Sequence, residues 1–277
     1  MAILSAGIFQ FNIRPGEVDG NVETARRGIR QLAGQGADLV LLPELFSCGF
    51  DYERISGHAA RTPEILVSLS ETARQEGLVI AGSLPEADGE GIYNSLYVLD
   101  ADGKTAAKYR KIHLFPLIAE DRHFRPGSEA VVCSTRLGTL GLMICFDLRF
   151  PELCRTLALQ GARIVLVSAQ WPARRIDHWD ALLRARAIEN QLFVLGANRY
   201  GGGQEVFYNG HSQVVSPEGC VLAMSAAADA VISAPIDPEA VRSAREPFDC
   251  LQSRRPGAYV CQADRDNTAN AERKPFV

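Results

Sequence analysis

The sequence lacks the features that mark several large protein classes. Its 277 residues carry no basic excess, because 29 Lys and Arg face 33 Asp and Glu, a formal net charge of −4. A mildly acidic chain is a poor general binder of nucleic acid or of membrane surfaces. No run of about 18 apolar residues occurs, so we expect no membrane span. The N-terminus has no basic stretch before an apolar one, so we expect no signal peptide and a cytoplasmic protein.

Nucleotide and metal motifs are missing as well. There is no GxxxxGK[ST] sequence, and the three glycines at 201–203 follow Asn198-Arg-Tyr as a plain turn. Seven cysteines are scattered from Cys48 to Cys261 without a CxxC pair. An odd, scattered set argues against a disulfide framework and against a cysteine zinc site. We therefore expect no bound metal and at least one free thiol.

What the sequence does have is an ordinary globular composition, 47% hydrophobic and 22% charged, arranged as alternating strands and helices. Such alternation with short connections favours a layered α/β fold. The predicted elements are a strand over 2–9, a helix capped by Asp19 or Asn21, a strand over 37–42, a helix beginning at Thr62 and Pro63 and ending at Gly77, and hairpins over 92–109 and 211–225.

One segment of the chain recurs. GADLVLLPE at 36–44 resembles GARIVLVSA at 161–169, and each follows a predicted helix and runs into a strand. The spacing, 161 − 36 = 125 residues, is too long for a solenoid repeat. Two similar halves packed sheet against sheet would explain it, although coincidence is the alternative for nine residues. No flexible linker divides the chain, so we expect one domain over 1–277, with a core over about 1–236 and a tail, a short helix plus an extended segment, over about 237–277.

Cys145 stands at a strand-to-helix turn. An apolar strand from Leu140 runs into it, and Pro151 marks the start of the next helix. This is the setting of a nucleophile elbow, which presents a reactive atom at the carboxyl end of a strand. A nearby helix N-terminus would favour the thiolate, and the following backbone N–H groups could hold an oxyanion. An inert core cysteine is the alternative for Cys145, and we expect the other six cysteines to be inert.

A catalytic thiol needs a base, and three charged residues are candidates for its partners. Glu44 ends an apolar strand directly after Pro43, where a carboxylate is costly to bury unless it is paired. Lys111 ends a basic run over 108–111, and Glu120 follows nine residues later. For each of the three, a solvent-facing charge is the alternative. Five histidines are other possible bases, but none has a local cysteine-protease signature.

Taken together, these segments resemble the nitrilase (carbon–nitrogen hydrolase) superfamily. LLPELF around Glu44, YRKIHLF around Lys111 and MICFDLRFPE around Cys145 occur in that family's order, and the resemblance covers roughly residues 1–236. AEDRHF, CFDLRFPE, AQWPARR and HWDALLRARAIENQ are most similar to the omega-amidase branch, which hydrolyses the terminal amide of small ω-amido acids such as 2-oxoglutaramate. The resemblance implies a four-layer α-β-β-α sandwich of two pseudo-symmetric halves, no cofactor, and a homodimer or higher homo-oligomer.

The resemblance also implies a role for each site residue. Cys145 would be the nucleophile, Glu44 the general base, and Lys111, with the backbone N–H after the cysteine, the stabiliser of the oxyanion. Glu120 would orient Lys111 or the substrate. An amide would release ammonia and leave a thioester, which water activated by Glu44 would hydrolyse. The residues expected to contact the substrate are Phe146, Arg149, Gln170 and Trp171.

The residues that would set specificity have alternatives. Arg149 either shapes the site or pairs with Asp147 structurally. Trp171 either walls the substrate pocket or is a rim aromatic between the sheets. Arg174 and Arg175 are candidates to receive a substrate carboxylate, with a solvated loop as the alternative.

Other functions use the same residues or the same fold. A deaminated-glutathione-type amidase, an N-carbamoyl amidase or a nitrilase could employ the same triad, and a carbamoyl substrate would release CO₂ besides ammonia. A scaffold that keeps the fold without the chemistry is disfavoured by intact Glu44, Lys111 and Cys145. A cysteine–histidine protease is disfavoured by the missing histidine signature. We therefore expect a small amide and water as partners, and neither nucleic acid nor membrane.

Overall fold

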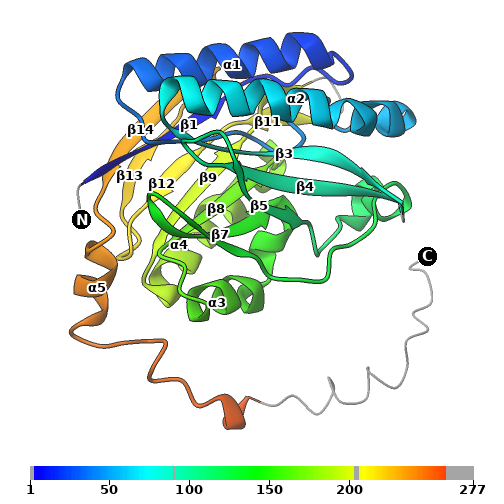
Figure 1. The fold of residues 1–277 in the computed structure, drawn as a ribbon. Coiled ribbons are helices and arrows are strands. Elements are labelled where there is room, and N and C mark those ends of the chain that lie inside the picture. The colour runs from blue at the N-terminus through cyan, green and yellow to red at the C-terminus, as the bar shows by residue number, and fades with distance from the viewer. Residues whose placement is uncertain (1–2, 90, 203–205, 260–277) are drawn as a thin grey trace.

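Two six-stranded mixed sheets packed face to face form the centre of the molecule. The computed structural model describes residues 3–89, 91–202 and 206–259. Helices α1 (Val18–Gly34) and α2 (Ile55–Glu76) cover the outer face of the first sheet (Figure 1). Helices α3 (Pro151–Leu159) and α4 (Ile176–Asn190) cover the second, which confirms the four-layer α-β-β-α sandwich. No helix in the described part of the chain is long and apolar enough to cross a membrane.

The first sheet is built around three parallel strands with antiparallel neighbours on either side. In spatial order its strands are β14 (Ala230–Ile236), β1 (Leu4–Gln10), β2 (Leu39–Leu41), β3 (Val79–Asp88), β4 (Gly91–Leu99) and β5 (Thr105–Arg110). Strands β1, β2 and β3 run parallel, while β14 and β4 run antiparallel to them. The predicted hairpin over 92–109 is confirmed as β4 and β5.

The second sheet repeats this pattern. In spatial order its strands are β13 (Val221–Met224), β12 (Gln213–Val215), β9 (Phe193–Asn198), β8 (Ile164–Ala169), β7 (Gly138–Ile144) and β6 (Val132–Thr135). Strands β7, β8 and β9 are parallel, and β6 and β12 flank them antiparallel. Because β2 and β8 hold equivalent places, the recurring segment marks two halves of the same topology. A small ribbon, β10 (Tyr200–Gly202) with β11 (Phe207–Asn209), completes the fold.

The apolar run at β2 is buried on both faces. Leu39 and Leu41 pack in the core between the sheets, whereas Val40 and Leu42 pack in the core beneath α1 and α2. A strand covered on both faces has no polar side to present, which explains its continuous apolar sequence. The strand ends beside the second sheet, so the residues that follow it, Glu44 to Phe46, are buried.

The start of α1 differs from the prediction. Neither Asp19 nor Asn21 caps the helix, which begins one residue before Asp19 and has no side-chain cap. Asn21 is buried in the first turns, where its amide donates to the carbonyls of Arg14 and Ser47. The asparagine therefore holds the loops beside the helix in place. One of the two carbonyls that it binds, that of Ser47, lies 26 residues away in the sequence.

The start of α2 was also predicted wrongly. The helix begins at Ile55, so Pro63 lies inside it and Thr62 is not its cap. The two additional turns bury Ile55 and Ala59, which offsets the hydrogen bond that an interior proline cannot donate. The predicted end is confirmed, because Gly77 closes the helix in the left-handed conformation that glycine adopts without strain.

The C-terminal segment is fastened by one glutamine. Gln191, at the end of α4, donates to the carbonyls of Ala244 and Phe248 and accepts from the Cys250 N–H. The expected short helix is α5 (Ala240–Arg245). The expected extended tail lies, for the most part, outside the described residues.

Candidate active site

Four charged or nucleophilic side chains meet where strands of both sheets end. Glu44 follows β2, Lys111 follows β5, and Cys145 follows β7, while Glu120 opens a short 3₁₀ turn after β5. Their exposed fractions are 0% for both glutamates, 1% for Lys111 and 9% for Cys145. The solvent-facing alternative is therefore wrong for all three charged residues.

Lys111 is the centre of this cluster. Its Nζ donates to Glu44 Oε1 at 2.8 Å and to Glu120 Oε1 and Oε2 at 2.9 and 2.8 Å. Burial alone would lower the pKa of Lys111, but the two facing carboxylates outweigh it and hold that pKa well above its ordinary value. The side chain is thus a fixed ammonium at the base of the site.

The Glu44 carboxylate has partners on both oxygens. Oε1 accepts from Lys111 and from Asn94 Nδ2, both at 2.8 Å, and Oε2 accepts from the Gln170 backbone N–H at 3.0 Å. Burial raises the pKa of Glu44 above its ordinary value, Lys111 opposes that shift, and the nearby Glu120 adds to it. A carboxylate with a raised pKa can accept a proton near neutral pH, which is what a general base must do.

Cys145 has a left-handed backbone, with φ of 47°. This conformation costs a non-glycine residue about 1 kcal/mol and marks a sharp turn. Burial raises the pKa of the Cys145 thiol well above its ordinary value, the charge of Glu44 adds to the shift, and Lys111 opposes it. The expected preference for thiolate is therefore wrong: Cys145 opens a 3₁₀ turn, and α3 begins only at Pro151. Such a thiol loses its proton to a neighbouring base, and the Glu44 carboxylate lies close enough to Cys145 for each to alter the pKa of the other.

A buried aspartate ties the lysine loop to the cysteine turn. Asp147 accepts from the Tyr109 hydroxyl at 2.7 Å, from the His113 backbone N–H at 3.0 Å and from the Ile144 backbone N–H at 2.9 Å. The suggested pairing of Asp147 with Arg149 is wrong, because both carboxylate oxygens are occupied by these partners. A residue outside the cluster thus fastens the segment that carries Lys111 to the segment that carries Cys145.

A pocket of about 550 Å³, including its open mouth, lies over Lys111 and Cys145. Its walls are mainly apolar, with five aromatic side chains among them. No histidine of the described chain lines the pocket, which removes the support for a cysteine–histidine pair. All four residues expected to contact the substrate line this pocket, and their contact with substrate stays a prediction. The lining side chains are Phe50, Phe115, Ile118, Phe146, Arg149, Gln170, Trp171, Pro172, Arg174, Arg175, Val206 and Tyr208.

Three arginines stand at the pocket without carboxylate partners. Arg149 lies over the Trp171 ring at 4.7 Å, and Arg175 lies over the Phe115 ring at 5.8 Å. The Nη1 of Arg175 is buried and has no hydrogen-bond partner among the described residues. No described carboxylate forms an ion pair with either of them or with Arg174. An anionic group entering the pocket would supply what these guanidinium groups lack.

Gln170 has its side chain engaged at both ends. Its Nε2 donates to the Glu44 carbonyl at 2.9 Å, and its Oε1 accepts from Arg199 at 2.8 Å. The backbone N–H of Gln170 also lies within hydrogen-bonding reach of the Cys145 sulfur. This residue therefore holds Glu44 in place and lies beside Cys145, the candidate base and nucleophile.

Asn94 is the site residue that the sequence analysis missed. It lies in β4 with no exposed surface and donates to both Glu44 and Glu120. The available signal was a polar residue inside an apolar hairpin strand, since a buried amide requires hydrogen-bond partners. Its partners, however, lie 50 and 26 residues away in the sequence.

The other described cysteines have no such surroundings. Burial raises the pKa of Cys48 and Cys154 to about 12 and that of Cys133 to about 11, so these thiols stay protonated. Cys220 is exposed, and Cys261 lies outside the described residues. Within the described ranges, no group of three or more His, Cys, Asp and Glu side chains could hold a metal ion.

Comparison with known sequences identifies related proteins. The sequence profile of the carbon–nitrogen hydrolase family matches residues 5–246. The 2-oxoglutaramate amidase of Bacillus subtilis is 34% identical over 252 residues, which cover 90% of this chain and 97% of that protein. An omega-amidase of Escherichia coli is 37% identical over 226 residues, covering 80% of this chain and 87% of that protein.

Comparison with solved structures agrees with the fold. A carbon–nitrogen hydrolase from Helicobacter pylori superimposes with a TM-score of 0.87 at 26% identity, covering 93% of this chain and 97% of that one. A variant of the amidase from Nesterenkonia sp. AN1 superimposes with a TM-score of 0.83 at 28% identity, covering 92% and 95%. In that structure the acetamide moiety of fluoroacetamide is added covalently at the active-site cysteine.

Proposed function

The chain belongs to the carbon–nitrogen hydrolase family, the nitrilase superfamily, as an amidase with an active-site cysteine, and we propose that it hydrolyses the terminal amide of small ω-amido acids. The observation that carries the proposal is the Cys145–Glu44–Lys111 cluster beneath a pocket whose arginines lack carboxylate partners. The names of the two relatives above, at 34% and 37% identity, support the substrate class. They leave the individual compound to experiment.

The first half-reaction acylates Cys145. Its sulfur attacks the amide carbonyl carbon while its proton passes to the neighbouring carboxylate of Glu44. The carbonyl oxygen becomes an oxyanion, which Lys111 and the backbone N–H after Cys145 stabilise. When the tetrahedral species collapses, Glu44 returns the proton to the leaving nitrogen. Ammonia departs and a thioester remains on Cys145.

The second half-reaction releases the acid. Glu44 takes a proton from water, and the hydroxide equivalent attacks the thioester carbonyl at the same oxyanion position. Collapse breaks the carbon–sulfur bond, and Glu44 returns its proton to the sulfur. One base therefore serves both half-reactions, and Glu120 keeps Lys111 in place through two hydrogen bonds. No step requires a metal or an organic cofactor.

In this proposal the pocket arginines bind the carboxylate of the substrate. An ω-amido acid carries a carboxylate at the end opposite its amide, so it places a negative charge at the pocket mouth when the amide reaches Cys145. The unpartnered Nη1 of Arg175 can donate a charge-assisted hydrogen bond to such a group. A neutral amide offers no equivalent partner.

Ammonia release across a substrate panel tests this proposal. We expect 2-oxoglutaramate and 2-oxosuccinamate to give higher kcat/KM values than butyramide, an N-carbamoyl amino acid or an aliphatic nitrile. Arg175→Met should raise KM for the ω-amido acids at least about tenfold, the loss of one charge-assisted contact, and leave the KM for butyramide unchanged. Arg155→Met is the matched control, because Arg155 also has a buried unpartnered Nη1 but does not line the pocket. CO₂ release from the carbamoyl compound as the fastest reaction would overturn the proposal.

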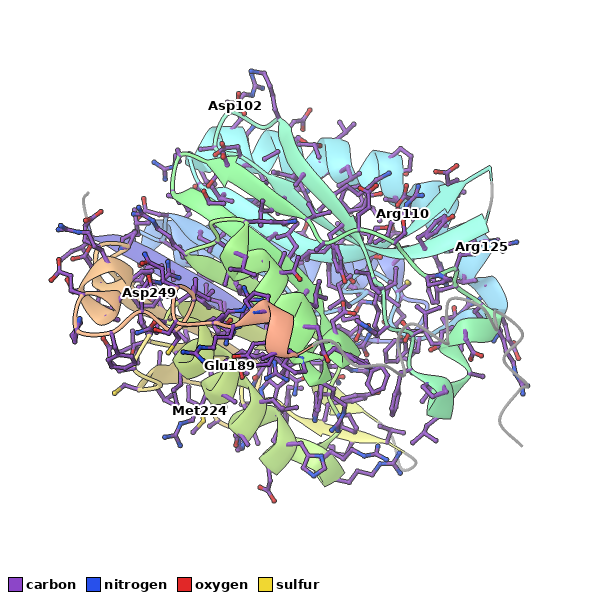
Figure 2. All side chains as sticks on the ribbon, turned by 90° about the horizontal axis from the view of Figure 1, so that it is seen from below. Asp102, Arg110, Arg125, Glu189, Met224 and Asp249 are labelled. Carbon is purple, nitrogen blue, oxygen red and sulfur yellow. The ribbon has the colours of Figure 1, made fainter. Side chains whose placement is uncertain are left out.

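The quaternary state and the compartment belong to the same proposal. We infer a homo-oligomer, which the exposed apolar side chains of the edge strand β13 support: Val221, Leu222 and Met224 are 41%, 43% and 52% exposed, and Figure 2 labels Met224 on that strand. Light scattering of the purified protein tests it, and a monomeric mass would contradict it.

We place the enzyme in the cytoplasm, where free thiols such as the six described here stay reduced.

A further inference from the structure

Asn94 is the neutral member of the buried charge cluster. Its side chain has no exposed surface, and its backbone carbonyl accepts from the Lys111 N–H at 2.9 Å. The residue thus contacts the lysine through its main chain and both glutamates through its side chain. Of the described residues, it is the one whose hydrogen bonds join all three charges.

The orientation of the Asn94 amide follows from its second partner. The Leu45 backbone N–H donates to Ser83 Oγ at 2.7 Å, so the Ser83 hydroxyl hydrogen is free to point the other way. That hydrogen points at Asn94 Oδ1, 2.8 Å away. The Asn94 NH₂ group must then face the carboxylates, donating to Glu44 Oε1 at 2.8 Å and Glu120 Oε1 at 3.2 Å. A chain of hydrogen bonds therefore runs from the Leu45 N–H through the Ser83 hydroxyl and the Asn94 amide to the Glu44 carboxylate.

The charges of the cluster do not balance, so its carboxylates depend on neutral hydrogen-bond donors such as Asn94. Two buried carboxylates face one ammonium, so one negative charge lacks a counter-charge. Amide donors to a carboxylate stabilise its ionised form in a low-dielectric interior. We propose that Asn94 is a positioning residue that holds Glu44 and Glu120 against Lys111 and stabilises the ionised form of Glu44, so that Glu44 can act as the base at neutral pH. The inference rests on the proposed role of Glu44.

The sign of the effect follows from the donors. A lost donor destabilises the carboxylate relative to the carboxylic acid, so the pKa of Glu44, already raised by burial, rises further. Tyr52 and Tyr208 stay neutral, since burial raises the pKa of Tyr208 to about 12 and that of Tyr52 higher still. The charged or titratable groups that face Glu44 are Lys111 from the end of β5, Glu120 from the following loop, Cys145 from the turn after β7, Tyr52 after β2 and Tyr208 from β11.

The principal variant is Asn94→Leu, which keeps the branched shape of the side chain and removes the donors. We expect the acid limb of its kcat/KM profile to move to higher pH by roughly one unit. At pH values below the midpoint of that limb, kcat/KM should fall about tenfold, because one pKa unit is there a factor of ten in the ionised fraction of the base. KM should change little. Asn190→Leu, the same change at a buried asparagine of α4 outside the pocket, should keep the wild-type limb.

A second variant and a second assay separate this inference from the proposed function. Ser83→Ala removes the group that orients the amide and should move the limb in the same direction by less. Alkylation of Cys145 by iodoacetamide across pH, followed on its peptide by mass with Cys145→Ala as the blank, reports proton transfer to Glu44 without turnover. If the wild type hydrolyses no amide, the proposed function fails and the alkylation limb still decides the role of Asn94. The inference would be overturned if the acid limbs of Ser83→Ala and of folded Asn94→Leu coincided with that of the wild type. If Asn94→Leu does not fold, the result for Ser83→Ala decides.

Discussion

The two halves of the molecule share a topology and differ in the chemistry at their strand ends. The turn after β2 carries Glu44, whereas the corresponding turn after β8 carries Gln170. The turn after β7 carries Cys145, whereas the chain after β1 continues with Phe11, a buried apolar side chain. In the proposed mechanism, the first half thus provides the two glutamates and the lysine, and the second half provides the nucleophile. Neither half contains a complete site.

Hydrogen bonds that cross between the halves hold the base against its partners. Ser168 donates its hydroxyl to the Leu42 carbonyl at 2.7 Å, and the Glu44 N–H donates to the Ala169 carbonyl at 3.4 Å. Gln170 returns two hydrogen bonds, one to the Glu44 carbonyl and one to its carboxylate. The position of the carboxylate thus depends on the packing of one sheet on the other, and a change in one half should alter the chemistry of the other.

The largest expected effect removes the contribution of the second half. Cys145→Ala should lower kcat/KM at least about 10⁴-fold, because among the described residues no other thiol lines the pocket. The protein should stay folded, as circular dichroism and thermal unfolding would show, because the change removes one sulfur atom. Phe11→Ala, at the corresponding place in the first half, is the contrasting variant. It should cost about 3–5 kcal/mol of unfolding free energy and leave the activity per folded molecule close to wild type. Wild-type turnover by Cys145→Ala would refute the division of labour.

Removing the cation of the first half should affect stability and activity together. Lys111→Met leaves Glu44 and Glu120 buried without a counter-charge, which should cost about 3–5 kcal/mol in urea unfolding. The pKa of Glu44, already above its unfolded value, rises further, so the folded state binds a proton that the unfolded state has released. The variant's stability should therefore fall as pH rises from 5 to 8, more steeply than that of the wild type. A pH-independent difference would contradict the arrangement.

The pH profile of the wild type tests whether the halves act as one site. Below the pKa of Glu44 the base is protonated and cannot take the Cys145 proton. Burial and the charge of Glu120 raise this pKa, so the acid limb of kcat/KM should have its midpoint above 4.5, the ordinary glutamate value. The midpoint belongs to the coupled cluster and not to Glu44 alone. A midpoint at or below 4.5 would mean that the base is outside this cluster.

The smallest expected effect loosens one contact between the halves. Ser168→Ala removes the hydrogen bond to the Leu42 carbonyl and should cost about 1–3 kcal/mol of unfolding free energy. Because Glu44 follows two residues after Leu42, kcat should also fall several-fold while KM stays unchanged. Thr72→Ala, which breaks a hydrogen bond within α2 alone, is the control. Equal effects of the two variants on kcat would show that the contact serves stability only.

The sequence predicted those parts of the site that local patterns encode. Glu44 and Cys145 follow apolar strands, so their positions at strand ends identified them as candidates. The order of the three motifs, as in the nitrilase superfamily, predicted that they act together with Lys111. The recurring segment predicted the two halves because each copy is a complete buried strand. Local patterns also predicted the left-handed stop at Gly77.

Long-range contacts explain what the sequence could not predict. Asn94 acts through residues 26 and 50 positions away, and Asn21 through one 26 positions away, so neither spacing is visible in a local window. The start of α2 was misplaced because Pro63 imitates a first-turn proline, while the burial that extends the helix to Ile55 is tertiary. The raised pKa of Cys145 is likewise a consequence of burial rather than of the local turn.

The most direct test of the account is the identity of the acylated residue during turnover. The enzyme is mixed with 2-oxoglutaramate, quenched in acid at a series of millisecond times, digested and analysed by mass spectrometry. We expect an adduct with the mass of the substrate acyl group on the peptide that contains Cys145, rising before steady-state ammonia release and absent from Cys145→Ala. Ammonia release with the acyl group on another residue, or with no adduct at any quench time, would contradict the mechanism.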